Sequence, residues 1–233
     1  MNKTLVTFLT IIFCLTSSIG WSADFQKGFN AYNKDDFATA LREWTPLAEQ
    51  GDVRAQYNLG QMYRRGDGVL QNYKTAVKWY RLSAEQGDAR AQYNLGLMHK
   101  NGDGVLQNYK TAVKWYRLSA KQGDARAQYN LGQMYRRGDG VLEDYKTAVK
   151  WYRLSAEQGF AIAQLNLGIS YTLGNGVIQD NIYAHMWVNI SVSNGHKNAV
   201  KVRDFIAKKM TSTDISTAQK LASECVEKKY KGC

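Results

Sequence analysis

The chain is poor in the residues that build catalytic and metal centres. Its three histidines, His99, His185 and His196, have no metal-ligand spacing, and no serine stands in a nucleophile-elbow motif. It has three cysteines, and none lies in the repeated part of the chain. Because catalysis needs a constellation of such groups, the sequence predicts a protein that is not an enzyme and that holds no cofactor or metal.

Long apolar runs are also scarce. One run, Leu5–Leu15, follows a lysine and precedes the small residues Gly20 and Ser22. This order predicts a secretory signal peptide over residues 1–22, with Ala23 as the first residue after cleavage. The run is too short to cross a bilayer, which takes about 20 apolar residues. We therefore expect an exported protein, periplasmic or secreted, that does not span a membrane.

Acidic residues are outnumbered, because 31 Lys and Arg stand against 20 Asp and Glu, for a net charge of +11. An exported basic protein meets anionic lipid, cell-wall polymer or acidic protein surfaces more readily than nucleic acid. We expect no nucleic-acid partner. Charge alone does not choose among the other partners, and it can simply serve solubility.

What the sequence has in abundance is repetition. The segment 52–87 recurs at 88–123 with six substitutions and at 124–159 with three, and a diverged fourth copy ends at Gly195. A fixed period of 36 residues predicts an all-α fold, an α-α superhelix in which antiparallel helical hairpins stack as a solenoid. The expected organisation is a degenerate N-terminal capping repeat at 23–50, four repeats at 51–194 and C-terminal capping helices at 195–233.

Each repeat predicts two helices joined by a glycine turn. Apolar residues recur at helical spacing in both, and the rows Ala55, Leu59, Met62, Tyr63 and Ala76, Trp79, Tyr80, Ala84 are expected in the core. Gly60 predicts a close helix crossing, since glycine in a helix otherwise costs about 1 kcal/mol. Gly66 is the expected left-handed helix end and Asn72 the next N-cap. Val69 and Leu70 are expected to plug the turn, and Trp79, Trp115, Trp151 and Trp187 to be core residues.

Two cysteines follow the leader, Cys225 and Cys233, eight residues apart at the C-terminus. In an oxidising compartment they are expected to form a disulfide that pins a helix end to the tail. Two free thiols are the alternative.

These residues resemble the Sel-1-like repeat family, a relative of the tetratricopeptide repeats. The shared pattern runs through Ala55, Leu59, Gly60, Tyr63, Gly66, Gly68, Val69, Asn72, Ala76, Trp79 and Tyr80, and it recurs 36 and 72 residues later. The resemblance implies a right-handed superhelix that serves as a scaffold for protein interaction. Some exported members with cysteine-stapled repeats are described as β-lactamase-like, but the repeats of this chain contain no cysteine.

The first helix of each repeat carries a polar stripe opposite the core. Asparagine offers a donor and an acceptor, and arginine binds carboxylates in a planar fork. If the first helices line a concave wall, this stripe would suit an extended peptide or an acidic segment. The alternative is that the asparagines pair with neighbouring backbone or helices and the arginines are only solvated. The candidate partner-binding residues are Arg54, Asn58, Gln61, Arg65, Arg90, Asn94, Arg126, Asn130, Arg137 and Asn166.

The second helices carry basic rows: Lys74, Lys78 and Arg81; Lys110, Lys114, Arg117 and Lys121; Lys146, Lys150 and Arg153. They support an alternative function, adhesion of a basic convex face to anionic lipid or cell-wall polymer. Duplication offers a simpler explanation of the repeated basic residues. The three copies are nearly identical, so they count as one observation and not as three. A hydrolase of β-lactam or peptidoglycan bonds is a third hypothesis. We prefer the first, a non-enzymatic scaffold that binds a protein or peptide through its concave surface.

Overall fold

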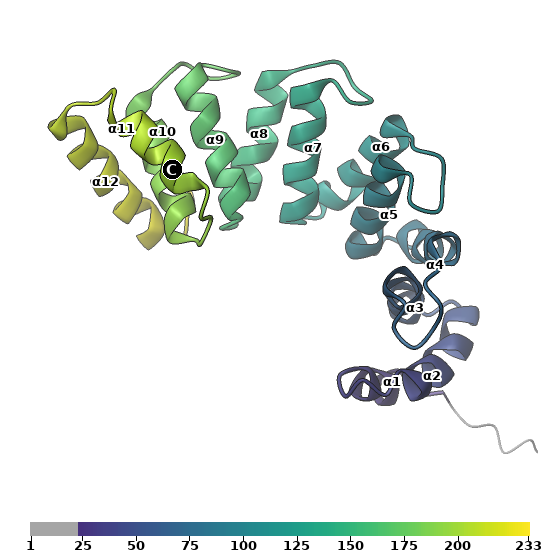
Figure 1. The fold of residues 1–233 in the computed structure, drawn as a ribbon. Coiled ribbons are helices and arrows are strands. Elements are labelled where there is room, and N and C mark those ends of the chain that lie inside the picture. The colour runs from purple at the N-terminus through teal and green to yellow at the C-terminus, as the bar shows by residue number, and fades with distance from the viewer. Residues whose placement is uncertain (1–22) are drawn as a thin grey trace, which may run out of the picture.

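The protein is described from a computed structural model that covers residues 23–233, and the predicted leader lies outside this part of the chain. The described residues form twelve helices and no strand, and successive helices pair as antiparallel hairpins (Figure 1). The helices are α1 (Phe25–Tyr32), α2 (Phe37–Glu49), α3 (Val53–Arg65), α4 (Tyr73–Glu85), α5 (Ala89–Asn101), α6 (Tyr109–Lys121), α7 (Ala125–Arg137), α8 (Tyr145–Ala156), α9 (Ala161–Leu173), α10 (Asn181–Ser193), α11 (Ala199–Ala207) and α12 (Ser212–Glu227). The predicted all-α solenoid is confirmed.

The ends of the helices follow from local side-chain chemistry. Asp52 caps α3 by accepting a hydrogen bond from the backbone N–H of Ala55 at 3.0 Å. Gly66 ends this helix with φ +83°, which is the left-handed conformation expected of a glycine at this position. Asn72 then caps α4 by accepting from the N–H of Thr75 at 3.0 Å. The same caps recur in the next repeats, so each copy of the sequence specifies its own hairpin.

The two helices of a hairpin cross closely at a glycine. A Cβ atom added to Gly60 would lie 2.6 Å from the ring of Tyr80, and one added to Gly96 would lie 2.7 Å from the ring of Tyr116. The close helix crossing predicted at Gly60 is confirmed, and the ring of the tyrosine on the second helix fills the space beside the glycine. Tyr80, Tyr116 and Tyr152 are at most 1% exposed and form the centre of each repeat core.

Two expectations about the core are wrong in detail. Trp187 is fully buried, but Trp79, Trp115 and Trp151 are only partly buried and pack against the core cluster between the first helix of their own repeat and the preceding unit. Leu70 does not plug its turn, because its side chain is 91% exposed, whereas Val69 packs against the first core cluster.

A relay of amides joins each hairpin to the one before it. Gln86, at the end of α4, donates to the side-chain oxygen of Gln56 at 2.8 Å, and Gln56 donates to the carbonyl of Ala48 in α2 at 3.0 Å. Equivalent pairs are Gln122 with Gln92, Gln158 with Gln128, and Asn194 with Gln164. Because Gln56 is buried, each of its hydrogen bonds avoids the cost of an unpaired polar group and fixes how one repeat sits on the next.

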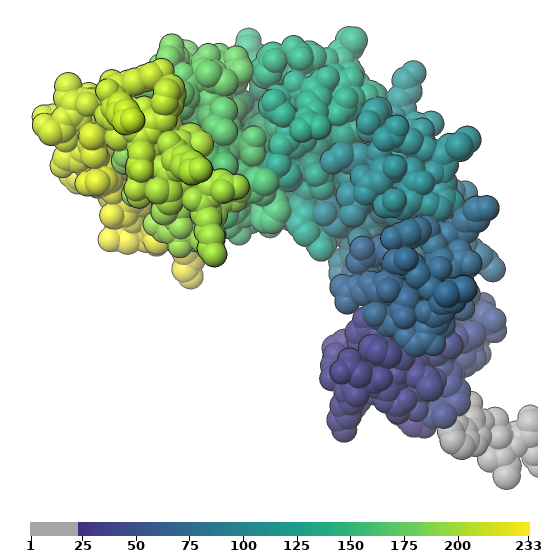
Figure 2. Space-filling model, viewed as in Figure 1, coloured from purple at the N-terminus to yellow at the C-terminus, as the bar shows by residue number. Residues whose placement is uncertain are grey.

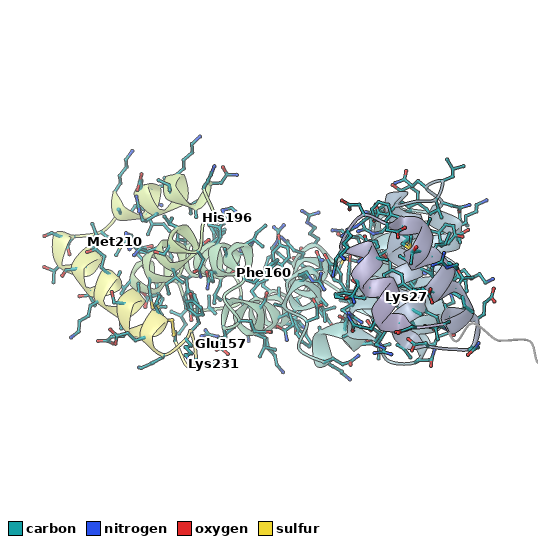
Figure 3. All side chains as sticks on the ribbon, turned by 90° about the horizontal axis from the view of Figure 1, so that it is seen from below. Lys27, Glu157, Phe160, His196, Met210 and Lys231 are labelled. Atoms are coloured by element: carbon teal, nitrogen blue, oxygen red, sulfur yellow. A yellow bond between two sulfur atoms is a disulfide. The ribbon has the colours of Figure 1, made fainter. Side chains whose placement is uncertain are left out.

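The C-terminal helices close the stack. Thr211 and Asp214 form a capping box at the start of α12. Cys225 and Cys233 are joined by a disulfide, with Cα atoms 5.6 Å apart. The tail reaches back over the end of α10, where the hydroxyl of Tyr230 donates to the side-chain oxygen of Asn194 at 3.0 Å. Figure 3 shows this part of the tail, near Lys231, beside the turn that follows α8.

The stack of hairpins is curved, and both ends bend toward the same side (Figures 1 and 2). Helices α3 and α5 lie nearer the inside of this curve than their partners α4 and α6 (Figure 1). Residues on the free face of the first helices therefore look into the hollow of the solenoid.

Candidate interaction surface

A row of three arginines runs along the first helices of successive hairpins. Arg54, Arg90 and Arg126 hold the same repeat position, and their side chains are 45–59% exposed. Each guanidinium lies over an aromatic ring of the preceding unit, at 4.0 Å from the ring centre of Phe25, 4.2 Å from Tyr57 and 4.4 Å from Tyr93, respectively. We call these three residues the arginine row.

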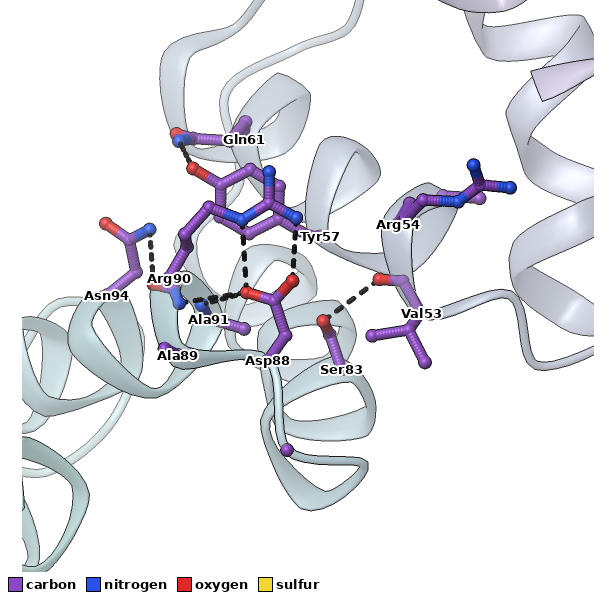
Figure 4. Close-up of polar contacts among 12 residues, drawn as sticks. Val53, Arg54, Tyr57, Gln61, Ser83, Asp88, Ala89, Arg90, Ala91 and Asn94 are labelled. Carbon is purple, nitrogen blue, oxygen red and sulfur yellow. Dashed lines mark hydrogen bonds and ion pairs between the residues drawn. The ribbon is translucent and has the colours of Figure 1, made fainter. Parts of the chain in front are cut away.

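The N-cap aspartate of the same helix accepts a hydrogen bond from each arginine, as Figure 4 shows for Asp88 and Arg90. Asp88 accepts from Nη2 of Arg90 at 2.7 Å and from its Nε at 3.3 Å, while it also caps the N–H of Ala91 at 2.9 Å. The hydrogen bond with Asp88 raises the pKa of Arg90. In the unbound protein the guanidinium of Arg90 is thus charged, stacked on a ring and fixed in direction.

This arrangement matters more for binding than for stability. An exposed ion pair contributes about 0–1 kcal/mol, and an exposed cation–π contact about 0.5–1 kcal/mol. A long side chain that is already ordered, however, loses less entropy when it binds a ligand. In the described part of the chain the hydrogen bonds of Arg90 use Nε and Nη2, and the two N–H donors of Nη1 make none of them.

The row stops at the fourth repeat. Ile162 stands at the arginine position and Phe160 at the position of the capping aspartate. The ring of Phe160 instead packs edge-on against Tyr129, with centres 5.7 Å apart. The predicted polar stripe therefore becomes apolar toward the C-terminus, where Ile169 and Leu173 continue it on α9.

The asparagines of the stripe are mostly bonded to the protein itself. Asn94 is 6% exposed and donates to the carbonyl of Arg90 at 3.0 Å, and Asn166 donates to the carbonyl of Ile162 at 2.8 Å. Asn130 is partly buried. For Asn94 and Asn166, the structure matches the alternative interpretation of the stripe, in which asparagine pairs with its own or a neighbouring helix. Asn58 is partly buried and lines a cavity described below.

Gln61 is also part of a network. Its amide nitrogen donates to the hydroxyl of Tyr57 at 2.7 Å, and its oxygen accepts from Tyr80 at 2.9 Å and from Arg64 at 3.0 Å. Gln133 repeats most of this arrangement in the third repeat. Arg65 and Arg137, at the ends of α3 and α7, remain exposed.

The sequence did not single out a cavity between α1 and α3. It has a volume of about 170 Å³ and is lined by Phe29, Tyr32, Asn33 and Trp44 on one side and by Tyr57, Asn58, Gln61 and Arg65 on the other. Phe29 is 43% exposed there. The available signal was that the capping unit places aromatic residues where the repeats have Gln61 and Arg64.

The second helices present a different surface. The basic residues predicted there are exposed, apart from the partly buried Arg153. The turn of each repeat also projects one aliphatic side chain that is about 90% exposed: Leu70, Leu106, Leu142 and Ile178. Lys146 and Ile178 line one shallow depression, so the aliphatic and basic rows adjoin.

The histidines do not form a site. Burial, together with the charge of Arg81, lowers the pKa of His99, and burial together with Arg203 lowers that of His185. Among residues 23–233, no group of three or more His, Cys, Asp or Glu side chains is placed to hold a metal ion. No helix in this range has both the length and the apolar character needed to cross a membrane.

Comparison with known proteins identifies the architecture. The chain is similar to a protective antigen present in uropathogenic Escherichia coli strains that displays an SLR fold, with 34% identity and a TM-score of 0.81 over 88% of this chain. The match covers 46% of that antigen, so the chain spans about half its length. A Sel1 repeat protein from Oxalobacter formigenes is 32% identical, with a TM-score of 0.75 over 88% of this chain and 85% of its own.

An immunity protein from Pseudomonas aeruginosa, 16% identical with a TM-score of 0.52 over 87% of this chain and 83% of its own, shares the fold alone. None of the curated proteins matches the chain. The model of the Sel1 repeat, a unit that typically acts as a protein-interaction module, matches residues 53–88, 89–124, 125–160 and 161–196. These four matches cover more than half of the sequence, and the chain belongs to the Sel1 repeat family.

Proposed function

We propose that this protein is a non-enzymatic scaffold that binds an acidic, extended peptide segment of a partner protein along the inside of its curve. The observation that carries the proposal is the arginine row, in which three guanidiniums are stacked, ion-paired at one edge and open at the other. Bidentate pairing with carboxylates is the recognition that such a fixed fork supports best.

The spacing of the row sets the spacing of acidic residues in the ligand. Each guanidinium lies over a ring of the preceding first helix, so successive members of the row are one helix diameter, about 10 Å, apart. An extended chain advances about 3.3 Å per residue, so carboxylates about three residues apart would meet successive guanidiniums. Because Asn94 and Asn166 already bond to their own helices, the charged residues supply most of the recognition.

Two variants with the same net charge test the proposal. A phage library of random 12-residue peptides is panned on the wild-type protein, and the recovered peptides are expected to be rich in Asp and Glu. Replacing Arg54, Arg90 and Arg126 together by Gln should weaken their binding at least tenfold, as measured by calorimetry. Replacing Lys78, Lys114 and Lys150 by Gln, on the outer helices, should leave it nearly unchanged. Equal losses in the two variants would show that only overall charge matters and would refute the proposal.

A second function, adhesion to an anionic surface, is favoured by one observation. The exposed aliphatic row at Leu70, Leu106, Leu142 and Ile178 adjoins the lysines of the second helices, a combination suited to the interface of an anionic bilayer. Sedimentation with vesicles of phosphatidylglycerol and phosphatidylcholine tests it. Adhesion should fall on replacing Leu106 and Leu142 by Ser, and it should fall with salt.

We also propose that the protein works outside the cytoplasm. The leader predicted at 1–22 supports this location, as does a disulfide between Cys225 and Cys233, which an oxidising compartment maintains. The mass of the protein recovered from a bacterial periplasm or culture medium is expected to correspond to a chain that begins at Ala23. Retention of the whole leader in the cytoplasm would contradict this location.

A further inference from the structure

The cavity between α1 and α3 has a different lining from the cavity of about 150 Å³ that lies between α7, α8 and α9. Gly28 of α1 is equivalent to Gly60 of α3. A Cβ atom added to Gly28 would clash with the ring of Trp44, just as one added to Gly60 would clash with the ring of Tyr80. In the same alignment Phe25 is equivalent to Tyr57. Each of these rings lies under the arginine on the first helix of the following unit.

Counting on from these positions, Phe29 stands where the first and third repeats have glutamine, Gln61 and Gln133, and Tyr32 stands where they have arginine, Arg64 and Arg136. In the first repeat, the side chains of Gln61 and Arg64 occupy the equivalent space, and they form hydrogen bonds with each other and with Tyr57 and Tyr80. The capping unit has aromatic rings there instead, and a hollow of about 170 Å³ remains in front of Trp44.

The aromatic residues that line this hollow favour an apolar ligand group. The hydroxyl of Tyr32 donates to Asp67 at 2.6 Å and accepts from Arg65 at 3.4 Å, and Trp44 donates to the carbonyl of Phe25 at 3.2 Å. The polar atoms of Tyr32 and Trp44 therefore already have partners, and these residues offer ring faces, while Asn33 and Asn58 add polar atoms to the lining. A cavity of about 150 Å³ holds a benzene molecule, so one phenyl side chain fits.

The arginines near the hollow favour a negatively charged ligand. Arg65 lies on the rim and is exposed, and the arginine row begins with Arg54 on the same helix. We propose that the hollow is an anchor site for one aromatic side chain of an acidic peptide, whose neighbouring carboxylates pair with Arg65 and continue along the arginine row. This inference rests on the proposed function, which it deepens by naming the anchor residue of the ligand.

The test uses a fluorescein-labelled synthetic peptide of eight residues with one phenylalanine flanked by glutamates. Its binding to the purified protein is followed by fluorescence anisotropy. Phe29→Gln, which installs the residue of the first and third repeats, should weaken binding about tenfold, in keeping with the loss of most of the burial of one phenyl ring. Phe205→Gln is the matched control, because Phe205 is 54% exposed on α11 at the other end of the stack.

A second peptide, with glycine in place of phenylalanine, makes the test specific. It should bind the wild-type protein about tenfold more weakly, but it should bind the F29Q variant as weakly as the first peptide does, because the ring no longer has a pocket. Equal binding of the first peptide to F29Q and to the wild type would overturn the inference, as would the same loss on removing the phenylalanine in both proteins.

The variants also separate this inference from the function on which it rests. If the Arg54, Arg90 and Arg126 variant loses peptide binding while F29Q keeps it, the anchor site fails and the arginine row stands. If F29Q loses binding while the arginine variant keeps it, the row fails. If neither peptide binds the wild type at millimolar concentration, both proposals fail.

Discussion

The near-identity of the repeats allows one buried hydroxyl to be compared in three almost equal settings. Tyr80, Tyr116 and Tyr152 are equally buried at equivalent positions, but only two have hydrogen-bond partners. Tyr80 donates to Gln61 at 2.9 Å, and Tyr152 donates to Gln133 at 3.1 Å. The hydroxyl of Tyr116 is buried with no partner in the described part of the chain.

The cause is a single substitution in the second repeat. Leu97 stands where the other two repeats have glutamine, so the acceptor is missing. A buried hydroxyl without a partner costs about 1–3 kcal/mol, whereas a hydrogen bond in place contributes about 0.5–1.5 kcal/mol. Opposite effects are therefore expected from the same change, Tyr to Phe.

We expect Tyr80→Phe and Tyr152→Phe each to lower the free energy of unfolding by about 1 kcal/mol. Tyr116→Phe should raise it by about 1 kcal/mol, because the hydroxyl that it removes is unpaired. Urea unfolding followed by circular dichroism measures the three differences, compared as midpoint shifts at a common slope. Tyr116→Phe destabilising the protein as much as Tyr80→Phe would refute the reasoning.

Restoring the acceptor provides the complementary test. Leu97→Gln should gain stability from a new hydrogen bond to Tyr116, and this gain should vanish in the background of Tyr116→Phe. The double-mutant cycle should give a coupling free energy of about 1 kcal/mol. A coupling near zero would show that the two side chains do not meet as the structure places them.

Two further predictions concern pH and redox state. Burial lowers the pKa of His99 below its unfolded value of about 6.5, so the unfolded chain binds more protons, and stability should fall as pH drops below about 6.5. His99→Tyr, the residue of the first repeat, should reduce the slope of unfolding free energy between pH 7 and pH 5, and an unchanged slope would contradict the assignment. Replacing Cys225 and Cys233 by Ser should cost about 2–3 kcal/mol, and a reducing agent should lower the melting temperature of the wild type but not of this variant.

The hairpin frame was predictable because its determinants are local. A glycine that must adopt φ > 0, such as Gly66, and an N-cap such as Asn72 act within a few residues of the helix end that they define. The tryptophan row was predicted less well. Trp79 and Tyr80 are neighbours on one apolar stripe, and periodicity does not say which of them fills the notch at Gly60. That choice depends on how closely the helices cross.

The candidate surface was predictable as a stripe but not as a set of contacts. Arg90 meets Tyr57, a residue of the preceding repeat, so the stack exists only once two hairpins are packed. For the asparagines, the stripe predicted contacts with a partner that the structure instead places within the chain. Asn94 lies on the predicted face, but its amide turns back to the carbonyl one turn earlier, a local alternative that spacing alone leaves open.

Repetition creates a problem of register for any partner. If the binding free energy came only from identical rows at Arg54, Arg90 and Arg126, a ligand shifted by one repeat would lose a single contact and would remain bound in several positions. Specificity is a difference between such states, so it must come from places where the repeats differ. The second repeat differs at positions such as Leu97 and His99, and the ends differ most: the aromatic hollow at Phe29 precedes the row, and the apolar residue Ile162 ends it. A segment with one aromatic anchor beside its acidic residues can satisfy both ends in a single register, whereas a purely acidic segment can slide.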